Sequence, residues 1–234
     1  MDTDINWEKE EIVRNITTLW GNMTDQQYAT LLAHLSIQTY KKDEFIYKDL
    51  QCPRHALYLV HGKVKIFKDG IGGRNQIIRV MKPTDFFGYR AYFAHEDYKT
   101  AAMAIEFCAV ASFPIDILLQ LMSQNFNISR FFIATLSKEL GASDDRTVNL
   151  TQKHIRGRLA EALIFLKDSY GLEEDGYTLS IYLSREDLAN LSNMTTSNAI
   201  RTLSAFANEK LVAIDGRKIK IIKEEDLRHI SELG

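Results

Sequence analysis

The sequence has few cysteines and no long apolar run. Only Cys52 and Cys108 occur in 234 residues, too few for the disulfide framework of a small secreted domain. No apolar run approaches the about 20 residues that a membrane-spanning helix needs. The first six residues are acidic rather than basic, unlike a secretory signal. We therefore expect a cytoplasmic protein without membrane association.

Motifs of catalysis and of metal binding are also missing. The sequence has no Gly-rich phosphate loop, no pair of metal ligands at a typical spacing and no Gly-x-Ser-x-Gly nucleophile motif. The acidic stretches Asp144-Asp145 and 173–175 consist of adjacent residues, whose side chains diverge, so solvated charge explains them better than catalysis. We expect neither an enzyme nor a metal site.

The sequence also lacks an excess of positive charge. Lys and Arg number 29 against 31 Asp and Glu, which gives a net charge of −2. Acidic side chains slightly outnumber basic ones even from His154 to the end of the chain. A protein that coats nucleic acid without specificity needs a broad positive surface, whereas a sequence-specific binder needs only a local one. The charge excludes the first class and permits the second.

Residues 184–203 carry the most informative pattern of the chain. Ser184 can cap a first helix, and Asp187 three residues later completes a capping box. Asn193 stands where a tight turn needs a left-handed residue, which Asn tolerates well. Thr195 can then cap a second helix. Two short helices joined in this way are typical of the helix-turn-helix, which places its second helix in the DNA major groove.

The second helix is predicted to have two different faces. Its inner, apolar face is expected to comprise Ala199, Ile200 and Leu203. The opposite face offers hydrogen-bonding side chains of the kind that read base edges. With the capping residue, the predicted DNA-binding residues of this helix are Thr195, Thr196, Ser197, Asn198 and Arg201. The alternative is that these are two amphipathic helices of an ordinary small helical domain.

A hairpin is predicted directly after these helices. Residues 211–222 alternate between apolar and polar on both sides of Asp215-Gly216, a strong two-residue hairpin signal. Arg217 and Lys218 at the tip are expected to contact DNA phosphates. Residues 177–183 read as a companion strand. Together these patterns predict a winged helix-turn-helix.

The region from Glu44 to about Phe113 is predicted to consist of short strands. Runs of β-branched and aromatic residues alternate with turn signals, as in a barrel or sandwich. The predicted strands are 44–47, 56–60, 63–67, 76–81 and 101–112, and the predicted turns are 61–62, 69–73 and 82–85. A short amphipathic helix is expected upstream, at 24–36.

The region from Pro114 to about Gln152 is helical in pattern. One row of side chains recurs at steps of 3 and 4, as in the seam of a coiled coil. The residues of this predicted dimer interface are Ile133, Leu136, Leu140, Ser143, Thr147 and Leu150. The alternative is a helix packed only on its own barrel. A further helix over 154–168 opens the DNA-binding part.

The order of barrel, long helix and winged helix-turn-helix resembles the cyclic-AMP receptor protein/FNR (Crp/Fnr) family of bacterial transcription regulators. The anchors are Leu57–Val64, Asp85-Phe-Phe-Gly88, Gly157-Arg158 and the helix-turn-helix. The resemblance implies an α+β fold, with an N-terminal cyclic-nucleotide-binding-like β-barrel (jelly roll), a long dimerisation helix and a C-terminal winged helix-turn-helix. The expected domains are 1–113, 114–152 and 153–234.

The resemblance also implies partners and roles. Such proteins are homodimers that bind palindromic operators in double-stranded DNA, with RNA polymerase as a possible further partner and an effector in the barrel. Thr196, Ser197 and Arg201 match the base-reading positions, and only Arg201 keeps the guanidinium that the family often has there. A guanidinium suits a bidentate contact to guanine. The operator is therefore expected to differ from the best-known consensus.

The matching effector positions depart from the cyclic-nucleotide binders of the family. Tyr89 replaces the Glu that accepts the ribose hydroxyls, and Lys99-Thr100 replaces the Arg-Ser that binds the cyclic phosphate. Ser143 keeps one of two hydroxyls that contact adenine. The expected effector-binding residues are Gly88, Tyr89, Arg90, Lys99, Thr100 and Ser143. We expect cyclic AMP not to bind in the family's usual manner.

Other effectors stay open at this stage. An iron–sulfur cluster needs four thiolates, which two cysteines do not supply. Haem stays possible, and its conceivable axial ligands are Cys52 (in Cys52-Pro53), His34, His55, His61, His95 and His154. Another small molecule, or no ligand at all, is a further option. A third interpretation is a cyclic-nucleotide-like barrel that serves as a scaffolding module.

Overall fold

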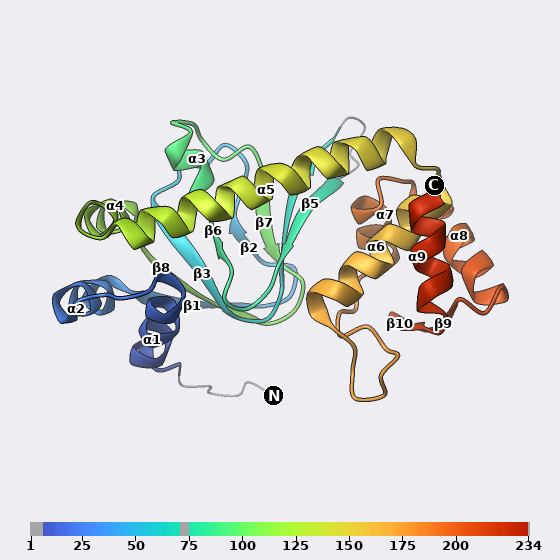
Figure 1. Cartoon of the computed structure of the whole chain (residues 1–234), viewed down its shortest axis with the longest axis horizontal. Coiled ribbons are helices and arrows are strands. Elements are labelled where there is room, and N and C mark those ends of the chain that lie inside the picture. The colour runs from blue at the N-terminus through green and yellow to red at the C-terminus, as the bar shows by residue number, and fades with distance from the viewer. Residues whose placement is uncertain (1–6, 71–74, 234) are drawn as a thin grey trace. The chain divides into compact units, whose positions relative to one another are not determined.

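A computed structural model of the chain describes residues 7–70 and 75–233 (Figure 1). The chain divides into two compact units. Of the described residues, the first contains 7–68 and 78–140, and the second contains 69–70, 75–77 and 141–233. The long helix α5 (Phe126–Gln152) contributes residues to both units.

The first unit is built on two four-stranded sheets. Their strand orders are β1-β8-β3-β6 and β2-β7-β4-β5, and neighbouring strands pair antiparallel wherever their register is defined. The strands are β1 (Ser36–Tyr40), β2 (Phe45–Tyr47), β3 (His55–His61), β4 (Val64–Asp69), β5 (Asn75–Met81), β6 (Phe86–Phe87), β7 (Ala101–Ala104) and β8 (Cys108–Pro114). The prediction of a barrel of short strands is confirmed. The segment 101–112 forms two strands rather than one, because residues 105–107 bend the chain away from the ladder.

Two of the predicted turns show why the barrel strands end where they do. Gly62 has a φ of +86°, and a Cβ on it would lie 2.3 Å from the carbonyl oxygen of Phe107. Only glycine fits this close approach between β3 and β8. At the second turn, Asp85 donates its backbone N–H to the carbonyl of Lys82 at 3.1 Å. The predicted turn at 69–73 lies largely outside the described residues.

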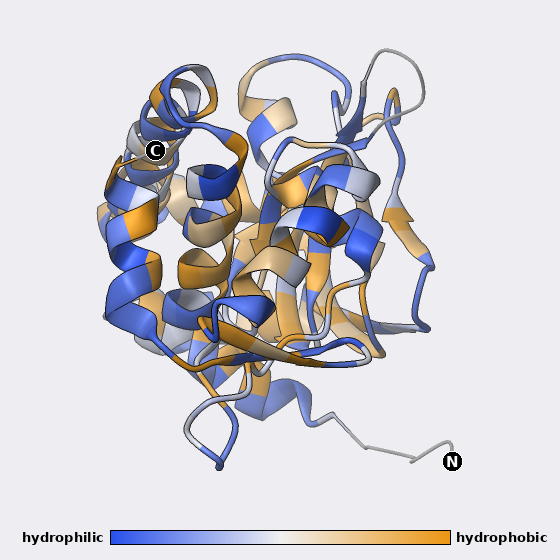
Figure 2. Cartoon of the chain, turned by 90° about the vertical axis from the view of Figure 1, so that its right-hand side faces the viewer, coloured by the Kyte–Doolittle hydropathy of each residue, from blue (hydrophilic) through white to orange (hydrophobic). Residues whose placement is uncertain are grey.

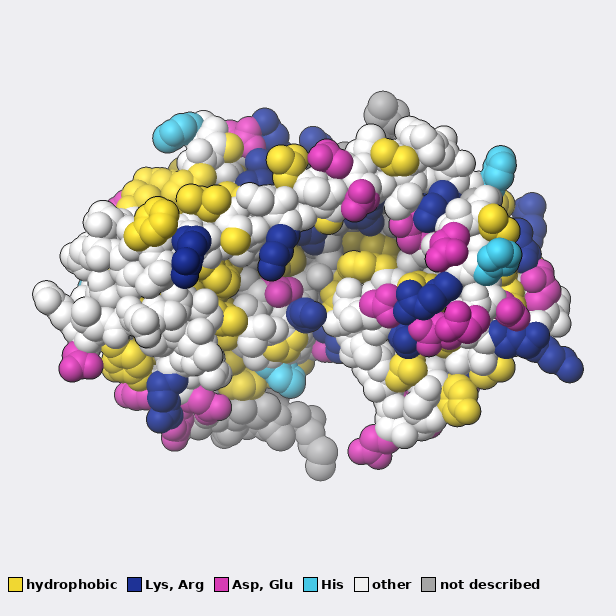
Figure 3. Space-filling view, in the orientation of Figure 1, with side chains coloured by type: hydrophobic (Ala, Val, Ile, Leu, Met, Phe, Trp, Pro, Cys, Tyr) yellow, Lys and Arg dark blue, Asp and Glu magenta, His cyan; other side chains and the backbone are white. Residues whose placement is uncertain are grey.

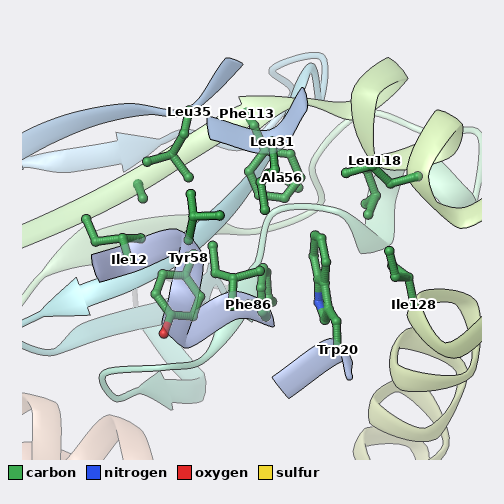
Figure 4. Packing of buried hydrophobic residues seen from close by; sticks show 14 of the residues in the cluster. Ile12, Trp20, Leu31, Leu35, Ala56, Tyr58, Phe86, Phe113, Leu118 and Ile128 are labelled. Atoms are coloured by element: carbon green, nitrogen blue, oxygen red, sulfur yellow. The ribbon is translucent and has the colours of Figure 1, made fainter. Parts of the chain in front are cut away.

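Four shorter helices complete the first unit. They are α1 (Lys9–Trp20), α2 (Asp25–His34), α3 (Arg90–Phe93) and α4 (Ile115–Gln124). The predicted helix at 24–36 is confirmed as α2, which Thr24 and Gln27 cap reciprocally. Figure 4 shows the core that these elements enclose, with Trp20 of α1 beside Phe86 of β6. Their rings stack with centroids 5.5 Å apart.

The predicted helical region 114–152 consists of two helices. Asn125 breaks it, with an extended backbone at φ −143°. The Asn125 side chain accepts the backbone N–H of Asn127 at 3.0 Å and thereby caps the start of α5. Early in α5, Ile128 and Phe132 are buried in the core of the first unit. This anchors one end of the long helix on the barrel.

The second unit is mainly helical. It comprises α6 (Ile155–Tyr170), α7 (Arg185–Leu191), α8 (Thr196–Asn208), α9 (Glu224–Leu233) and the hairpin β9 (Val212–Asp215) and β10 (Lys218–Ile221). In Figure 2 its helices alternate between hydrophilic and hydrophobic residues, as amphipathic helices do. The helix predicted at 154–168 is confirmed. The segment predicted as a strand at 177–183 pairs with β10 only around Thr178. There the N–H of Leu179 donates to the carbonyl of Ile219 at 2.9 Å, and the carbonyl of Tyr177 accepts the N–H of Ile221 at 2.8 Å.

Candidate DNA-binding surface and effector cavity

Helices α7 and α8 form the predicted helix-turn-helix. Ser184 Oγ accepts the backbone N–H of Asp187 at 3.0 Å, and Thr195 Oγ1 accepts that of Asn198 at 3.3 Å. Asn193 adopts the predicted left-handed backbone, with a φ of +49°. Ala189 is fully buried and accepts the N–H of Met194 at 3.0 Å. The two caps and the turn therefore fix the angle at which α8 leaves α7.

The exposed face of α8 is partly the one that the sequence predicts. Thr196, Ser197 and Arg201 are exposed, and Asn198 is half-buried. Ile200 was expected on the inner face, and this expectation is wrong, because its side chain is 47% exposed. The buried row runs instead through Ala199, Thr202, Leu203 and Phe206. One step of about 100° around the helix separates Ile200 from this row.

Arg201 is the main cation of this face. No ion pair or hydrogen bond of its guanidinium is found among residues 7–70 and 75–233. The same holds for Arg217 in the hairpin turn within the described residues. A guanidinium in this state presents its donors to an incoming partner, and base edges and phosphates both accept them.

The hairpin turn is shifted by one residue from its predicted place. Asp215 pairs with Lys218, so the two turn residues are Gly216 and Arg217. Gly216 has a φ of +56°, and its carbonyl accepts Arg185 Nη2 of α7 at 2.6 Å. This hydrogen bond therefore connects the hairpin β9–β10, the wing, to α7 of the helix-turn-helix. The sequence analysis did not single out Arg185, since nothing local marks a contact between residues so far apart.

Lys218 is engaged within the unit. Its Nζ lies 3.7 Å from Glu173 and 5.3 Å from the ring centroid of Tyr182. Figure 3 likewise shows Lys and Arg side chains interspersed with Asp and Glu on the face in view. The second unit contains ion pairs such as Lys167–Glu224 at 2.6 Å. The local basic face expected for a sequence-specific binder therefore rests on a few guanidinium groups.

Helix α5 carries an exposed apolar row. Ile133 is 58% exposed and Leu140 is 64% exposed, and Ser143 and Thr147 are also exposed. Leu136 is half-buried and packs against the barrel core, and Leu150 is half-buried as well. The predicted interface is thus exposed at four of its six positions. Val148, half exposed, lies beside it and was not predicted.

The barrel encloses a cavity of about 240 Å³. Five of the six predicted effector residues line it: Gly88, Tyr89, Arg90, Lys99 and Thr100. Ser143 is not among the lining residues and is exposed on α5. Residues that the sequence analysis missed complete the wall, and they are Tyr47, Ile66, Lys68, Ile78, Arg79, Phe86, Phe87, Ala91, Tyr98 and Glu139. They come from strands, loops and two helices that are far apart in sequence, which no local pattern connects.

Three of the four cationic side chains that line the cavity are paired with a carboxylate. Arg79 Nη2 lies 3.1 Å from Glu139 Oε2, and Arg90 Nη2 lies 3.0 Å from Glu96 Oε1. Lys99 Nζ also contacts Glu96. Hydrogen bonds from Lys99 and Arg90 hold the pKa of Glu96 below its usual range. Burial has the opposite effect on Glu139 and raises its pKa, although Arg79 counteracts it.

Tyrosines line one side of the cavity. Tyr98 Oη donates to the carbonyl of Gly88 at 3.0 Å, and its ring stacks on Tyr47 with centroids 3.9 Å apart. Tyr89 is 2% exposed, and its ring packs edge-on against Phe132 at 4.8 Å. The Tyr89 hydroxyl is buried without a hydrogen-bond partner among the described residues. Burial raises the pKa of both phenols, so they stay protonated.

The cavity contains none of the haem ligands that the sequence predicts. None of its lining residues is a histidine or a cysteine. Cys52 and the five candidate histidines, His34, His55, His61, His95 and His154, are exposed. Among the described residues, no group of three or more His, Cys, Asp or Glu could hold a metal ion.

A cyclic-nucleotide-like barrel and a winged helix-turn-helix in one chain define the class of a DNA-binding regulator. Comparison with known families agrees, since the model of the cyclic nucleotide-binding domain matches residues 37–125 and that of the Crp-like helix-turn-helix domain matches residues 157–230. The chain belongs to the Crp/Fnr family and is a transcription regulator that binds double-stranded DNA. No helix in the described ranges is long and apolar enough to span a bilayer.

Individual relatives are distant but match over most of their length. A CRP-like cAMP-activated global transcriptional regulator of Mycobacterium tuberculosis is 25% identical over 177 residues, 75% of this chain and 79% of the relative. The probable transcriptional regulator flp of Lacticaseibacillus casei is 24% identical over 217 residues, 91% and 94% of the two chains. The structure of FixK2 from Bradyrhizobium japonicum superposes with a TM-score of 0.76 at 23% identity and covers 84% of this chain and 96% of that one.

Proposed function

We propose that the chain acts as a homodimer on a palindromic operator, and that a ligand in the barrel cavity sets its DNA affinity. The observation that carries the first part is the exposed face of α8, where Arg201 has no partner among the described residues. Thr196, Ser197 and Arg201 are the proposed base readers, and Thr195 and Asn198 are the further proposed DNA-binding residues of this helix. Arg217 and Lys218 of the wing are the proposed phosphate contacts.

The exposed apolar row of α5 supports the homodimer. Ile133 and Leu140 stand one heptad apart, the spacing of a coiled-coil seam. Burying them between two copies of α5 removes apolar surface from water. Leu136, Ser143, Thr147 and Leu150 complete the proposed interface. RNA polymerase is a proposed further partner on the family resemblance alone.

Selection of an operator from random DNA with the full chain tests this proposal. We expect two inverted half-sites, with centres about 34–36 Å apart, because each recognition helix of a two-fold dimer enters its own major groove. Sedimentation of the protein should show a dimer, and Ile133→Glu should weaken it. Lys138→Glu, on the same helix, is the matched control. A monomer at micromolar concentration, or a single half-site, would contradict the homodimer.

The lining of the cavity argues against cyclic AMP bound in the family's usual way and therefore favours another ligand. Although the Mycobacterium tuberculosis relative is described as cAMP-activated, Tyr89 here replaces the ribose-binding Glu, and it is buried against Phe132. Calorimetric titration of cyclic AMP into the full chain tests this. We expect no saturable binding at micromolar concentration. Saturable binding of one nucleotide per chain would show that Lys99 and Thr100 suffice.

A further inference from the structure

We propose that the cavity ligand is a small anion that replaces the Glu139 carboxylate as the partner of Arg79, with the Tyr89 hydroxyl as a second hydrogen-bond donor. This inference rests on the proposed function, because it takes the cavity as the ligand site and adds the chemical class of the ligand. In the structure, Glu139 occupies the position of the ligand's acidic group.

The charges that line the cavity favour an anion. Four lining side chains are cationic, namely Lys68, Arg79, Arg90 and Lys99, and Glu139 is the one acid among the lining residues. Glu96 lies outside the lining and pairs with Arg90 and Lys99, so positive charge still exceeds negative charge around the cavity. The remaining wall is largely aromatic and aliphatic. A concave site with apolar walls and one dominant sign of charge concentrates its field on the space inside. An acidic molecule is therefore preferred over a neutral or cationic one of the same size.

Glu139 stands at the end of the barrel-facing row of α5. Ile128, Phe132 and Leu136 come before it at steps of four residues, and all three pack against the apolar core of the first unit. Glu139 continues the row three residues later, but its neighbour is Arg79 at 3.1 Å rather than apolar side chains. Its position is therefore set by the helix, and a carboxylate is brought into the cavity wall.

The Glu139 carboxylate is an imperfect partner for Arg79. Its side chain is 19% exposed, and the loss of solvation raises its pKa more than Arg79 lowers it. A partly buried ion pair gains little unless additional hydrogen bonds satisfy its remaining acceptors. Arg79 is the single cation within ion-pair distance of Glu139 in the described chain. An incoming acid with more donors around it can therefore displace Glu139 towards solvent.

Tyr89 provides one of these additional donors. Its hydroxyl is buried and has no partner among the described residues. Tyr89, Arg79 and Glu139 line the same cavity, and the charges of the ion pair act on the pKa of the phenol. A buried hydroxyl without a partner is uncommon in native structures and calls for an explanation such as a missing ligand. An anion on Arg79 would accept a hydrogen bond from Tyr89 as well.

The size of the cavity favours a small metabolite. With Glu139 in its wall the cavity has a volume of about 240 Å³, below the range of about 300–1,000 Å³ usual for drug-sized ligands, and displacement of Glu139 adds the space of one carboxylate. The stacked rings of Tyr47 and Tyr98 close one side, and the hydrogen bond from Tyr98 to Gly88 holds this wall in place. The cavity therefore suits a carboxylic or phosphoric acid of a few carbon atoms better than a dinucleotide.

Calorimetric titration of the full chain with sodium succinate and with inorganic phosphate tests the inference. We expect Glu139→Gln to bind at least one of these anions about tenfold more tightly than the wild type, because it no longer competes for Arg79. Arg79→Met should abolish that binding. Glu96→Gln is the matched control, since Glu96 neutralises Arg90 and Lys99 but does not lie on α5. It should change the dissociation constants by less than about threefold.

Two outcomes would overturn the inference. If Glu139→Gln binds neither anion more tightly than the wild type, the Glu139 carboxylate does not compete with the ligand for Arg79. If Glu96→Gln enhances binding as much as Glu139→Gln, general charge and not displacement from Arg79 explains the effect. Thermal unfolding shows whether each variant is folded, and Arg79→Met/Glu139→Leu replaces the pair by apolar groups if Arg79→Met is not. Operator binding in the same samples separates this test from the DNA-binding part of the proposed function, which fails if no specific complex forms.

Discussion

The two cationic regions of the molecule differ in whether their arginines have ion-pair partners within the chain. On the recognition surface, Arg201 and Arg217 have no ion-pair partner in the described parts of the chain. In the barrel cavity, Arg79 is paired with Glu139, and Arg90 is paired with Glu96. Water solvates the exposed guanidinium groups of the first surface, whereas Arg79, whose side chain is 31% exposed, has Glu139 as an internal counter-charge. DNA can therefore join the first surface directly, but a ligand that pairs with Arg79 must displace Glu139.

Phe132→Ala is expected to have the largest effect and to act on the first unit. The Phe132 ring is 1% exposed and contacts Trp20, Phe86 and Tyr89. Removing a buried aromatic side chain costs about 3–5 kcal/mol. Both tryptophans of the sequence, Trp7 and Trp20, lie in this unit, so urea unfolding followed by tryptophan fluorescence measures the loss of stability.

Lys138→Ala is the control for Phe132→Ala. Lys138 lies on the same helix and is exposed, so its truncation should change the free energy of unfolding by less than about 0.5 kcal/mol. A circular-dichroism signal, dominated by helices of both units, should show whether the second unit still unfolds at the wild-type urea concentration. A loss below about 1 kcal/mol for Phe132→Ala would mean that α5 is not held on the barrel through this ring.

Arg201→Ala is expected to weaken specific DNA binding by roughly 1–3 kcal/mol, because a bidentate contact to a guanine is lost. Gel shifts on the selected operator and on random DNA measure it. Affinity for random DNA should change little, and binding of anions in the cavity should not change. Arg14→Ala removes an exposed arginine of α1 and serves as the control. An equal loss on both DNAs would make Arg201 a phosphate contact instead.

Local signals account for most of what the sequence predicts correctly. The caps at Ser184 and Thr195 and the left-handed Asn193 act within a few residues, and all three are confirmed. Helix α1 was missed because Glu8 at its start makes no side-chain cap, which leaves no start signal. The resemblance to the family then placed Tyr89 and Lys99 in the cavity, as the structure does.

Contacts between distant residues account for most of what the sequence does not predict. Arg79 and Glu139 meet across β5 and α5, and Arg185 reaches the wing turn at Gly216. Neither pair produces a periodic pattern in the sequence, because each residue taken alone is interpreted as an exposed charge. Ile200 was misplaced for a different reason. A shift of one residue in the assumed face rotates a helix by about 100°, and short helices give too few repeats to fix that face.

The exposed Ile200 adds an apolar side chain to the recognition surface. Its side chain lies next to Arg201 on α8 and is the apolar member of an otherwise polar face. We expect it to contact a thymine methyl group, the apolar feature of the major groove. Ile200→Ala should reduce operator affinity by about 1 kcal/mol, the value of roughly one buried methyl or methylene group.

Thymine-to-uracil replacement tests this contact without changing the protein. At one operator position, uracil should weaken binding of the wild type but not of Ile200→Ala, because the methyl and the side chain form one interaction. Ile222→Ala, another half-exposed isoleucine of the second unit, is the control and should keep the wild-type response. If losses from uracil and from Ile200→Ala simply add at every position, Ile200 contacts no methyl group.

Tyr89→Phe gives the smallest expected effect, and its sign distinguishes the two cavity tyrosines. The Tyr89 hydroxyl is buried without a partner in the described chain, so its removal should stabilise the unliganded protein by up to about 1 kcal/mol. Tyr98→Phe removes a hydroxyl that donates to Gly88 at 3.0 Å and should destabilise it by a similar amount. Urea unfolding of the two variants measures both changes. Each variant removes a single oxygen atom, so the two changes can be compared directly. Destabilisation by both variants would mean that the Tyr89 hydroxyl already has a hydrogen-bond partner. The cavity would then offer a ligand only its cationic groups.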